Sequence, residues 1–173
     1  MSKKKILTIP DPILREISQP VKKVDKDIKN LMDDMLETMY SANGIGLAAI
    51  QIGVPKRIIV MDLSKEKEKK PLFFVNPEIN NKNKVYSVYE EGCLSVPNQF
   101  AEIERPSTCE VKYLDYNGNE KILKAEGLLA TCIQHEMDHL EGVLFIDYLS
   151  KLKKSMIIKK LSKQKDKIDR IVV

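Results

Sequence analysis

The sequence contains two histidines, His135 and His139, which stand four residues apart with Glu136 directly after the first. On an α-helix, residues at positions i and i+4 share one face, so the two imidazoles can bind a single cation. A bound cation lowers the pKa of a coordinated water, and a neighbouring carboxylate can take the released proton. The pattern therefore predicts a hydrolytic metal centre with His135 and His139 as ligands and Glu136 as the general acid/base.

Two histidines bind a catalytic metal poorly without a third protein ligand, and the residues that follow do not supply one. The longer pattern H-E-x-x-H-x-x-G-x-x-H fits at Gly142 but fails at Phe145. No glutamate follows Glu141, and the later aspartates have no spacing argument in their favour: Asp147, Asp166 and Asp169. The third ligand is therefore expected upstream, among the cysteines.

Of the three cysteines, Cys93 is the best candidate for that ligand. Cys132 would share the histidine helix at ~7.5 Å along the axis from their midpoint, beyond the reach of its short side chain. Cys109 falls on the apolar face of an alternating strand, where a small buried hydrophobe is the default. Cys93 stands in EEGCLSVP, which we expect to be irregular and exposed, so its thiolate can complete a Cys–His–His site.

The elements that must position these residues follow from periodicity. Residues 26–41 have apolar side chains at helical spacing, with Asp25 as N-cap, and their methionines are expected to fill the core. The two histidines belong to a helix from Gly127 to near Gly142, and a last helix covers about 148–168. Four strands are expected between the helices, at residues 57–63, 71–79, 107–116 and 120–127, with a charged loop at 65–70 and a hairpin turn at 117–119.

This order of elements predicts an α+β fold. Antiparallel or mixed β-sheets would surround the central helix that bears the H-E-x-x-H motif, with an N-terminal helix and a C-terminal helix. The length of 173 residues suits one domain, covering 1–173. No apolar run approaches the ~20 residues of a bilayer span, so we expect no membrane association. Three free cysteines and the lack of an export signal favour a cytoplasmic location.

Charge is concentrated in the C-terminal tail, residues 151–173. Between residues 151 and 170 there are nine basic and two acidic residues, an excess of +7, whereas the whole chain carries +4. The remainder is therefore about −3 by subtraction. A basic tail can bind a polyanionic partner, and it can equally be a solvated helix with no partner.

A second glycine-rich segment is NGIGLAAIQIG, residues 43–53, which matches no phosphate-binding pattern. It is either a flexible turn before a strand or a place where backbone approaches a peptide ligand, with Gln51 as a polar contact. Three segments together resemble peptide deformylase of the bacterial type: GIGLAAIQ at 44–51, EGCLS at 91–95 and QHEMDH at 134–139. The likeness extends over nearly the whole chain.

The resemblance implies removal of the formyl group from the N-terminal formylmethionine of nascent polypeptides. It implies Cys93, His135 and His139 as metal ligands, Glu136 as general acid/base, and Gln51 with the Leu94 backbone N–H as oxyanion donors. The family's metal is typically Fe(II), and zinc, nickel or cobalt can replace it. The substrate would contact a set of residues from several segments: Ile45, Gly46, Tyr89, Glu91, Gly92, Leu128, Thr131 and Cys132. The tail would dock on the ribosome, and no DNA partner is implied.

Some positions depart from common relatives. Phe100 stands where many carry Arg, which predicts an altered preference for the downstream part of the substrate, and Thr131 makes the pocket slightly more polar. Arg105 is retained and is expected to orient acidic groups near the site. Two other functions compete with deformylation. One is a general metalloprotease or a deformylase-like protein of changed substrate. The other is a metal-binding or ribosome-binding module without catalysis, which the presence of Glu136 disfavours.

Overall fold

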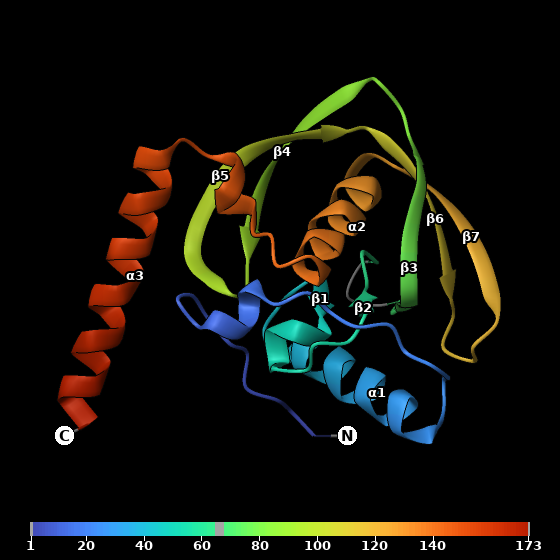
Figure 1. Ribbon diagram of the computed structural model, residues 1–173, viewed down its shortest axis with the longest axis horizontal. Coiled ribbons are helices and arrows are strands. Elements are labelled where there is room, and N and C mark those ends of the chain that lie inside the picture. The colour runs from blue at the N-terminus through green and yellow to red at the C-terminus, as the bar shows by residue number, and fades with distance from the viewer. Residues whose placement is uncertain (1, 65–67, 173) are drawn as a thin grey trace.

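The computed structural model describes residues 2–64 and 68–172, with side chains up to residue 164 (Figure 1). Part of the charged loop predicted at 65–70 and the end of the basic tail therefore lie outside the described residues. The order of elements is η1 (Pro12–Arg15), α1 (Lys26–Ser41), β1 (Gly46–Ala48), η2 (Ala49–Ile52), β2 (Ile58–Met61), β3 (Leu72–Lys82), β4 (Tyr86–Cys93), β5 (Val96–Pro106), β6 (Thr108–Leu114), β7 (Glu120–Glu126), α2 (Gly127–Leu140), η3 (Phe145–Tyr148) and α3 (Lys151–Val172).

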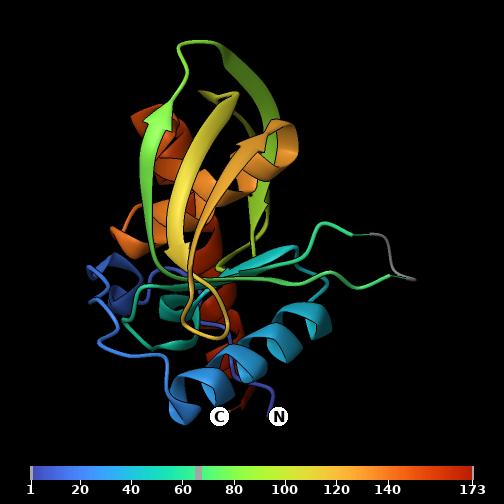
Figure 2. The same cartoon turned by 90° about the vertical axis from the view of Figure 1, so that its right-hand side faces the viewer.

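The strands form two antiparallel sheets around α2, which confirms the predicted α+β class. One sheet has the order β1-β2-β3-β6-β7, and the other is the two-stranded ribbon β4-β5. Figure 1 shows α2 in the centre, with β3, β6 and β7 on one side and the ribbon on the other. In Figure 2 the long strands rise above α1 and β1. The helix with the H-E-x-x-H motif is thus enclosed by both sheets.

Helix α1 forms as its sequence predicts and covers the first sheet. The Asp25 side chain accepts a hydrogen bond from the Ile28 N–H at 3.0 Å, which satisfies one free donor at the helix start. The apolar face is fully buried against β1 and β2, where Met32, Met35 and Met39 are 0% exposed. The prediction that these methionines fill the core is confirmed.

The hairpin of β6 and β7 is also confirmed. Its register pairs Leu114 with Glu120, and the turn between them contains Gly118 at φ +82°. That left-handed conformation is open to glycine at little cost. The hairpin leads directly into α2, so it fixes where the histidine helix begins.

The ribbon β4-β5 is the main difference from the predicted elements. Residues 86–93 and 96–106 are strands, and only Leu94 and Ser95 of EEGCLSVP form the turn between them, so the prediction of an irregular, exposed stretch around Cys93 is wrong. Cys93 ends β4 and is half-buried. A register shift between Gly92 and Cys93 marks an irregularity in the ladder, which turns the thiol away from the regular strand alternation.

The C-terminal helix α3 begins three residues later than predicted, because η3 occupies the residues before it. Figure 1 shows α3 at one edge of the molecule, beside β5. On its inner side, Ile157, Ile158 and Leu161 make apolar contacts with the third core cluster. The other buried members of this cluster are Ile9, Leu14, Val96, Ile103, Leu144, Phe145 and Ile146. Asp147 of η3 also pairs with Lys154 at 2.5 Å. Across residues 2–64 and 68–172, the structure contains no helix that is both long and apolar enough to cross a membrane.

Candidate metal centre and substrate pocket

Three residues from two elements meet at one point. Cys93 comes from the end of β4, and His135 and His139 come from successive turns of α2. Their ligand atoms all lie within 4.8 Å of one another, and Cys93 Sγ is 3.3 Å from His139 Nε2. Donors bound tetrahedrally to one transition metal are about 3.5 Å apart at usual bond lengths. One thiolate and two imidazoles at these separations form a metal-binding group.

His135 is held by a buried carboxylate. Its Nδ1–H donates to Glu91 Oε2 at 2.8 Å, which leaves Nε2 for the metal. Glu91 is 6% exposed, and Arg105 Nε donates to its other oxygen at 2.6 Å. Burial opposes the charge on Glu91, but the hydrogen bonds from His135 and Arg105 outweigh burial and lower the pKa of its carboxyl. Glu91 therefore stays ionised and fixes the orientation of the imidazole.

Arg105 extends this network to η3. Arg105 is 4% exposed, and its Nη1 donates a hydrogen bond to Asp138 Oδ2 at 2.8 Å. The Tyr148 hydroxyl donates to the same oxygen at 2.8 Å. The prediction that Arg105 orients acidic groups near the site agrees with these contacts, which tie β4, β5, α2 and η3 together.

His139 is fully buried, and its surroundings keep it neutral. Burial lowers the pKa of this imidazole well below its ordinary value, and the charges of His135 and Arg105 act in the same direction. A neutral imidazole is the form that binds a metal. His139 therefore presents a neutral donor rather than a second positive charge beside His135.

Glu136 lies beside the metal-binding group with its carboxyl unpaired. It is 5% exposed, its Oε2 has no hydrogen-bond partner within the described part of the chain, and burial raises the pKa of this carboxyl to about 7. The backbone of Gly46 on β1 approaches so closely that a Cβ built there would lie 2.5 Å from Glu136 Oε1. A buried carboxyl without a partner, tuned close to neutral pH, is suited to move protons.

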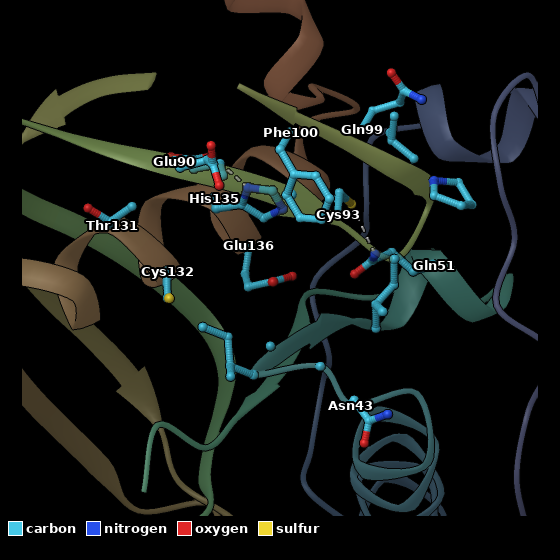
Figure 3. A pocket seen from close by; sticks show the side chains of 18 of the residues that line it. Asn43, Gln51, Glu90, Cys93, Gln99, Phe100, Thr131, Cys132, His135 and Glu136 are labelled. Atoms are coloured by element: carbon cyan, nitrogen blue, oxygen red, sulfur yellow. Dashed lines mark hydrogen bonds and ion pairs between the residues drawn. The ribbon is translucent and has the colours of Figure 1, made fainter. Parts of the chain in front are cut away.

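Gln51 supplies a fixed amide on the other side of Cys93. Its Oε1 accepts from the Ala48 N–H at 2.8 Å, and its Nε2 donates to Ser95 Oγ at 3.1 Å and to Cys93 Sγ at 3.6 Å. Gln51 is 1% exposed, so its amide cannot turn freely. Figure 3 shows Gln51, Cys93 and Glu136 around one space.

A cavity of about 490 Å³ opens at this point (Figure 3). Most residues predicted to contact the substrate line it, together with Glu136 and Gln51: Ile45, Gly46, Glu91, Gly92, Cys93, Leu94, Leu128, Thr131, Cys132 and His135. Tyr89 is not among the lining residues, and its hydroxyl lies near Gly127 instead. His139 lies behind the wall and is 0% exposed.

The other candidate ligands lie elsewhere. Cys132 is a wall of the cavity, where burial first of all raises the pKa of its thiol to about 12, so it remains a neutral packing group. Cys109 is buried in the apolar core that also contains Val111 and Ala125. Asp147 binds Arg15 at 2.6 Å rather than the metal group. The side chains of Asp166 and Asp169 lie outside the described residues.

Several cavity residues were missed in the sequence. They lie in the ribbon, and they are Glu90 of β4 and Val96, Pro97, Asn98 and Gln99 of β5. Asn43 and Gly44 also line the cavity, and they belong to the segment 43–53 that the sequence had offered as an approach of backbone to a peptide ligand. Asn43 and Asn98 adopt positive φ values of 56° and 58°, which asparagine tolerates better than most residues. The asparagines were a usable signal of tight backbone conformations, whereas only the family resemblance brought the segment 43–53 and the ribbon to one substrate site.

Comparison with known proteins identifies the family. The sequence model of the family described as polypeptide deformylase matches residues 3–155. The chain belongs to the polypeptide deformylase family.

Named relatives and solved structures agree with this assignment. The deformylase is 72% identical to a peptide deformylase of Pelagibacter ubique over the full length of both chains. It is 60% identical to one from Maricaulis maris, with 98% of each chain covered. A crystal structure of peptide deformylase from Ehrlichia chaffeensis in complex with actinonin has 48% identity and a TM-score of 0.91, covering 95% of this chain and 98% of that one.

The established activity of the family is therefore the activity of this enzyme. The deformylase removes the formyl group from formylmethionyl nascent polypeptides, and its Cys/His/His group is a metal-binding site within that family. This outcome confirms the resemblance seen in the three sequence segments. It excludes the competing readings of a general metalloprotease and of a module without catalysis.

Proposed function

We propose that Cys93, His135 and His139 hold one divalent metal ion and that Glu136 is the general acid/base of deformylation. The observation that carries the proposal is the meeting of three metal donors beside a buried carboxyl that lacks a partner. When bound, the ion supplies Lewis acidity, which activates water and polarises the formyl carbonyl. Fe(II) is the expected native metal from the family resemblance, and zinc, nickel or cobalt can occupy such a donor set.

Glu136 acts twice in this reaction. Its carboxylate takes a proton from the attacking water, and the water oxygen forms a bond to the formyl carbon. The carboxyl then delivers that proton to the amide nitrogen as the C–N bond breaks, which releases formate and a free amine. A pKa near 7 allows both directions of transfer at neutral pH.

The Gln51 amide and the Leu94 backbone N–H stabilise the oxyanion that develops on the formyl oxygen. Gln51 is already held by Ala48 and Ser95, so little reorganisation is needed when charge appears. Removing one such donor elsewhere costs about 10²–10³ in kcat. A Gln51→Leu variant is expected to lose activity on this scale.

The methionine side chain of the substrate occupies the apolar side of the cavity. Ile45, Leu128 and Cys132 form walls of that side, and Gly46, Gly92, Glu91 and Thr131 surround it. Full burial of a methionine side chain is worth ~1.5–3 kcal/mol, which is enough to select this residue over small polar ones. A backbone contribution from Tyr89 on β4 remains a prediction.

We also propose the setting in which the enzyme works. Residues 1–173 form one catalytic domain in the cytoplasm, where nascent formylated chains are made. The basic tail from residue 151 onward contacts ribosomal RNA, since its charge excess suits a polyanion and such contact would weaken with salt.

The test is a formate-release assay on protein purified without oxygen, with metal analysis of the same sample. The enzyme is expected to cleave formyl-Met-Ala-Ser and to leave both the unformylated peptide and internal bonds intact. Cys93→Ala is expected to lose the metal, and the matched variant Cys109→Ala is expected to keep it. Metal retained by Cys93→Ala, or full turnover by Glu136→Ala with metal bound, would contradict the roles proposed here.

A further inference from the structure

A second hollow lies beside the substrate cavity, between β5 and α3. It has a volume of about 830 Å³. Gln99 and Phe100 line both hollows, so the groove begins where the cavity ends. Phe100 is 66% exposed, and its ring lies over Gly92, where a built Cβ would fall 2.6 Å from it. The ring is therefore a shared wall, and a chain leaving the cavity past Phe100 enters the groove.

The wall formed by α3 is strongly positive. Four exposed lysines line it: Lys153, Lys159, Lys160 and Lys163. Glu102 is the sole acidic residue of the groove, whose lining lies wholly in the described part of the chain. None of the four lysines pairs with an acidic side chain that the structure describes. The groove thus offers several free positive charges in a row.

Apolar side chains lie between these charges. Met156 is 61% exposed, and Ile157 and Leu149 line the groove while packing against the third core cluster. Lys153, Met156, Lys160 and Lys163 follow one another at helical spacing, so they share one face of α3. An occupant of this face would combine acidic groups with apolar side chains, which is the chemistry of a peptide segment.

We propose that the groove binds the downstream residues of the formylated polypeptide and favours segments that contain Asp and Glu. From Lys153 to Lys163, α3 advances ~15 Å at its usual rise. An extended peptide covers about 17 Å in five residues, so one short segment can reach all four lysines. The inference rests on the proposed function, since the substrate enters the groove only after its formyl end has filled the cavity.

The test compares peptides of two lengths. A formyl-Met tripeptide ends before the groove, whereas two decapeptides carry either three Asp or three Lys among their fourth to eighth residues. Exposed charge pairs are individually weak, so we expect kcat/KM to be about fivefold higher for the acidic decapeptide at low salt. The difference should vanish near 0.5 M salt, because free charges are then screened over a few ångströms.

Charge reversal locates the effect. The double variant K153E/K160E is expected to prefer the basic decapeptide, with tripeptide turnover unchanged. The matched control K121E/K124E makes the same charge change on exposed lysines of β7, at the opposite edge of the molecule in Figure 1, and should keep the acidic preference.

The outcomes separate the two proposals. If the wild-type enzyme does not deformylate the tripeptide, this result would count against the proposed function and not against the groove. Equal rates for both decapeptides, or the same preference in K153E/K160E, would overturn the groove. If K153E/K160E loses affinity for ribosomes while the decapeptide ratio stays at its wild-type value, the lysines serve RNA binding and the peptide inference is wrong.

Discussion

The close packing of β1 against Glu136, the proposed general acid/base, gives a sharp test of the site geometry. Gly46 has no side chain, and Glu136 fills the space that a side chain at this position would need. In Gly46→Ala, the new Cβ would stand 2.5 Å from Glu136 Oε1 and 3.0 Å from its Cδ. Ordinary contact begins near 3.4 Å, so the carboxyl or the strand must move by about 0.9 Å.

A displacement of this size has a predictable effect on catalysis. Misplacing a catalytic group by ~1 Å can cost about 10²-fold in rate, because the reacting atoms no longer align. A 10²-fold loss corresponds to about 2.7 kcal/mol of transition-state stabilisation. We therefore expect kcat/KM of Gly46→Ala to fall about 10²-fold. The metal content should stay unchanged, because the three atoms nearest to the new methyl group all belong to Glu136 and not to a donor residue.

The assay is formate release at saturating and low substrate, with metal analysis and a thermal melt of each variant. Gly118→Ala is the matched control, since its positive φ makes alanine unfavourable by ~1 kcal/mol at a turn far from the cavity. That control should melt earlier and keep full activity. Activity of Gly46→Ala within threefold of wild type would refute the reasoning, because Glu136 would then tolerate the displacement.

Three further changes test other parts of the structure. Asp147→Asn removes a carboxyl whose pKa is lowered to about 2, mainly by the Arg15 hydrogen bond acting against burial. The ionised carboxylate stabilises the fold by about 1 kcal/mol after discounting for solvent screening. This stabilisation is present above pH 3.8 and is lost as the pH falls toward 2. Urea melts of variant and wild type should therefore differ at pH 6 and converge near pH 2. Glu91→Gln loosens His135 and should weaken metal affinity about 10–100-fold in a chelator competition, while equal affinity would mean that the carboxylate does not orient the ligand. Met32→Ala empties a fully buried site and should lower the free energy of unfolding by ~2–5 kcal/mol with kcat unchanged below the melting transition.

Periodicity and capping were sufficient to predict the helices α1, α2 and α3 and the strands β2, β3, β6 and β7. The apolar spacing of residues 26–41 and the N-cap at Asp25 predicted where α1 begins and ends, because both signals depend only on residues close together in the sequence. The motif around His135 gave the metal chemistry for the same reason, since i and i+4 positions meet on any helix. Local rules therefore predicted two of the three metal-binding residues together with the adjacent carboxyl of Glu136.

The ribbon β4-β5 and its contacts could not be predicted in this way. Gly92, Pro97 and Asn98 are residues that weaken a strand pattern, and β4 exposes alternate residues without a clear apolar face. The contact of Glu91 with His135 joins residues 44 positions apart, and it exists only because the ribbon folds over α2. The groove beside α3 was beyond sequence reasoning too, because charge in the tail says nothing about which face is hollow.

The position of Cys93 has a consequence for folding. The thiol belongs to the ribbon and the two imidazoles to α2, with 46 positions between Cys93 and His139. A cation bound by all three would close this long loop much as a disulfide does, but reversibly. By linkage, the free energy of metal binding is added to that of folding, so cellular metal supply would set how long the enzyme survives as well as how fast it works.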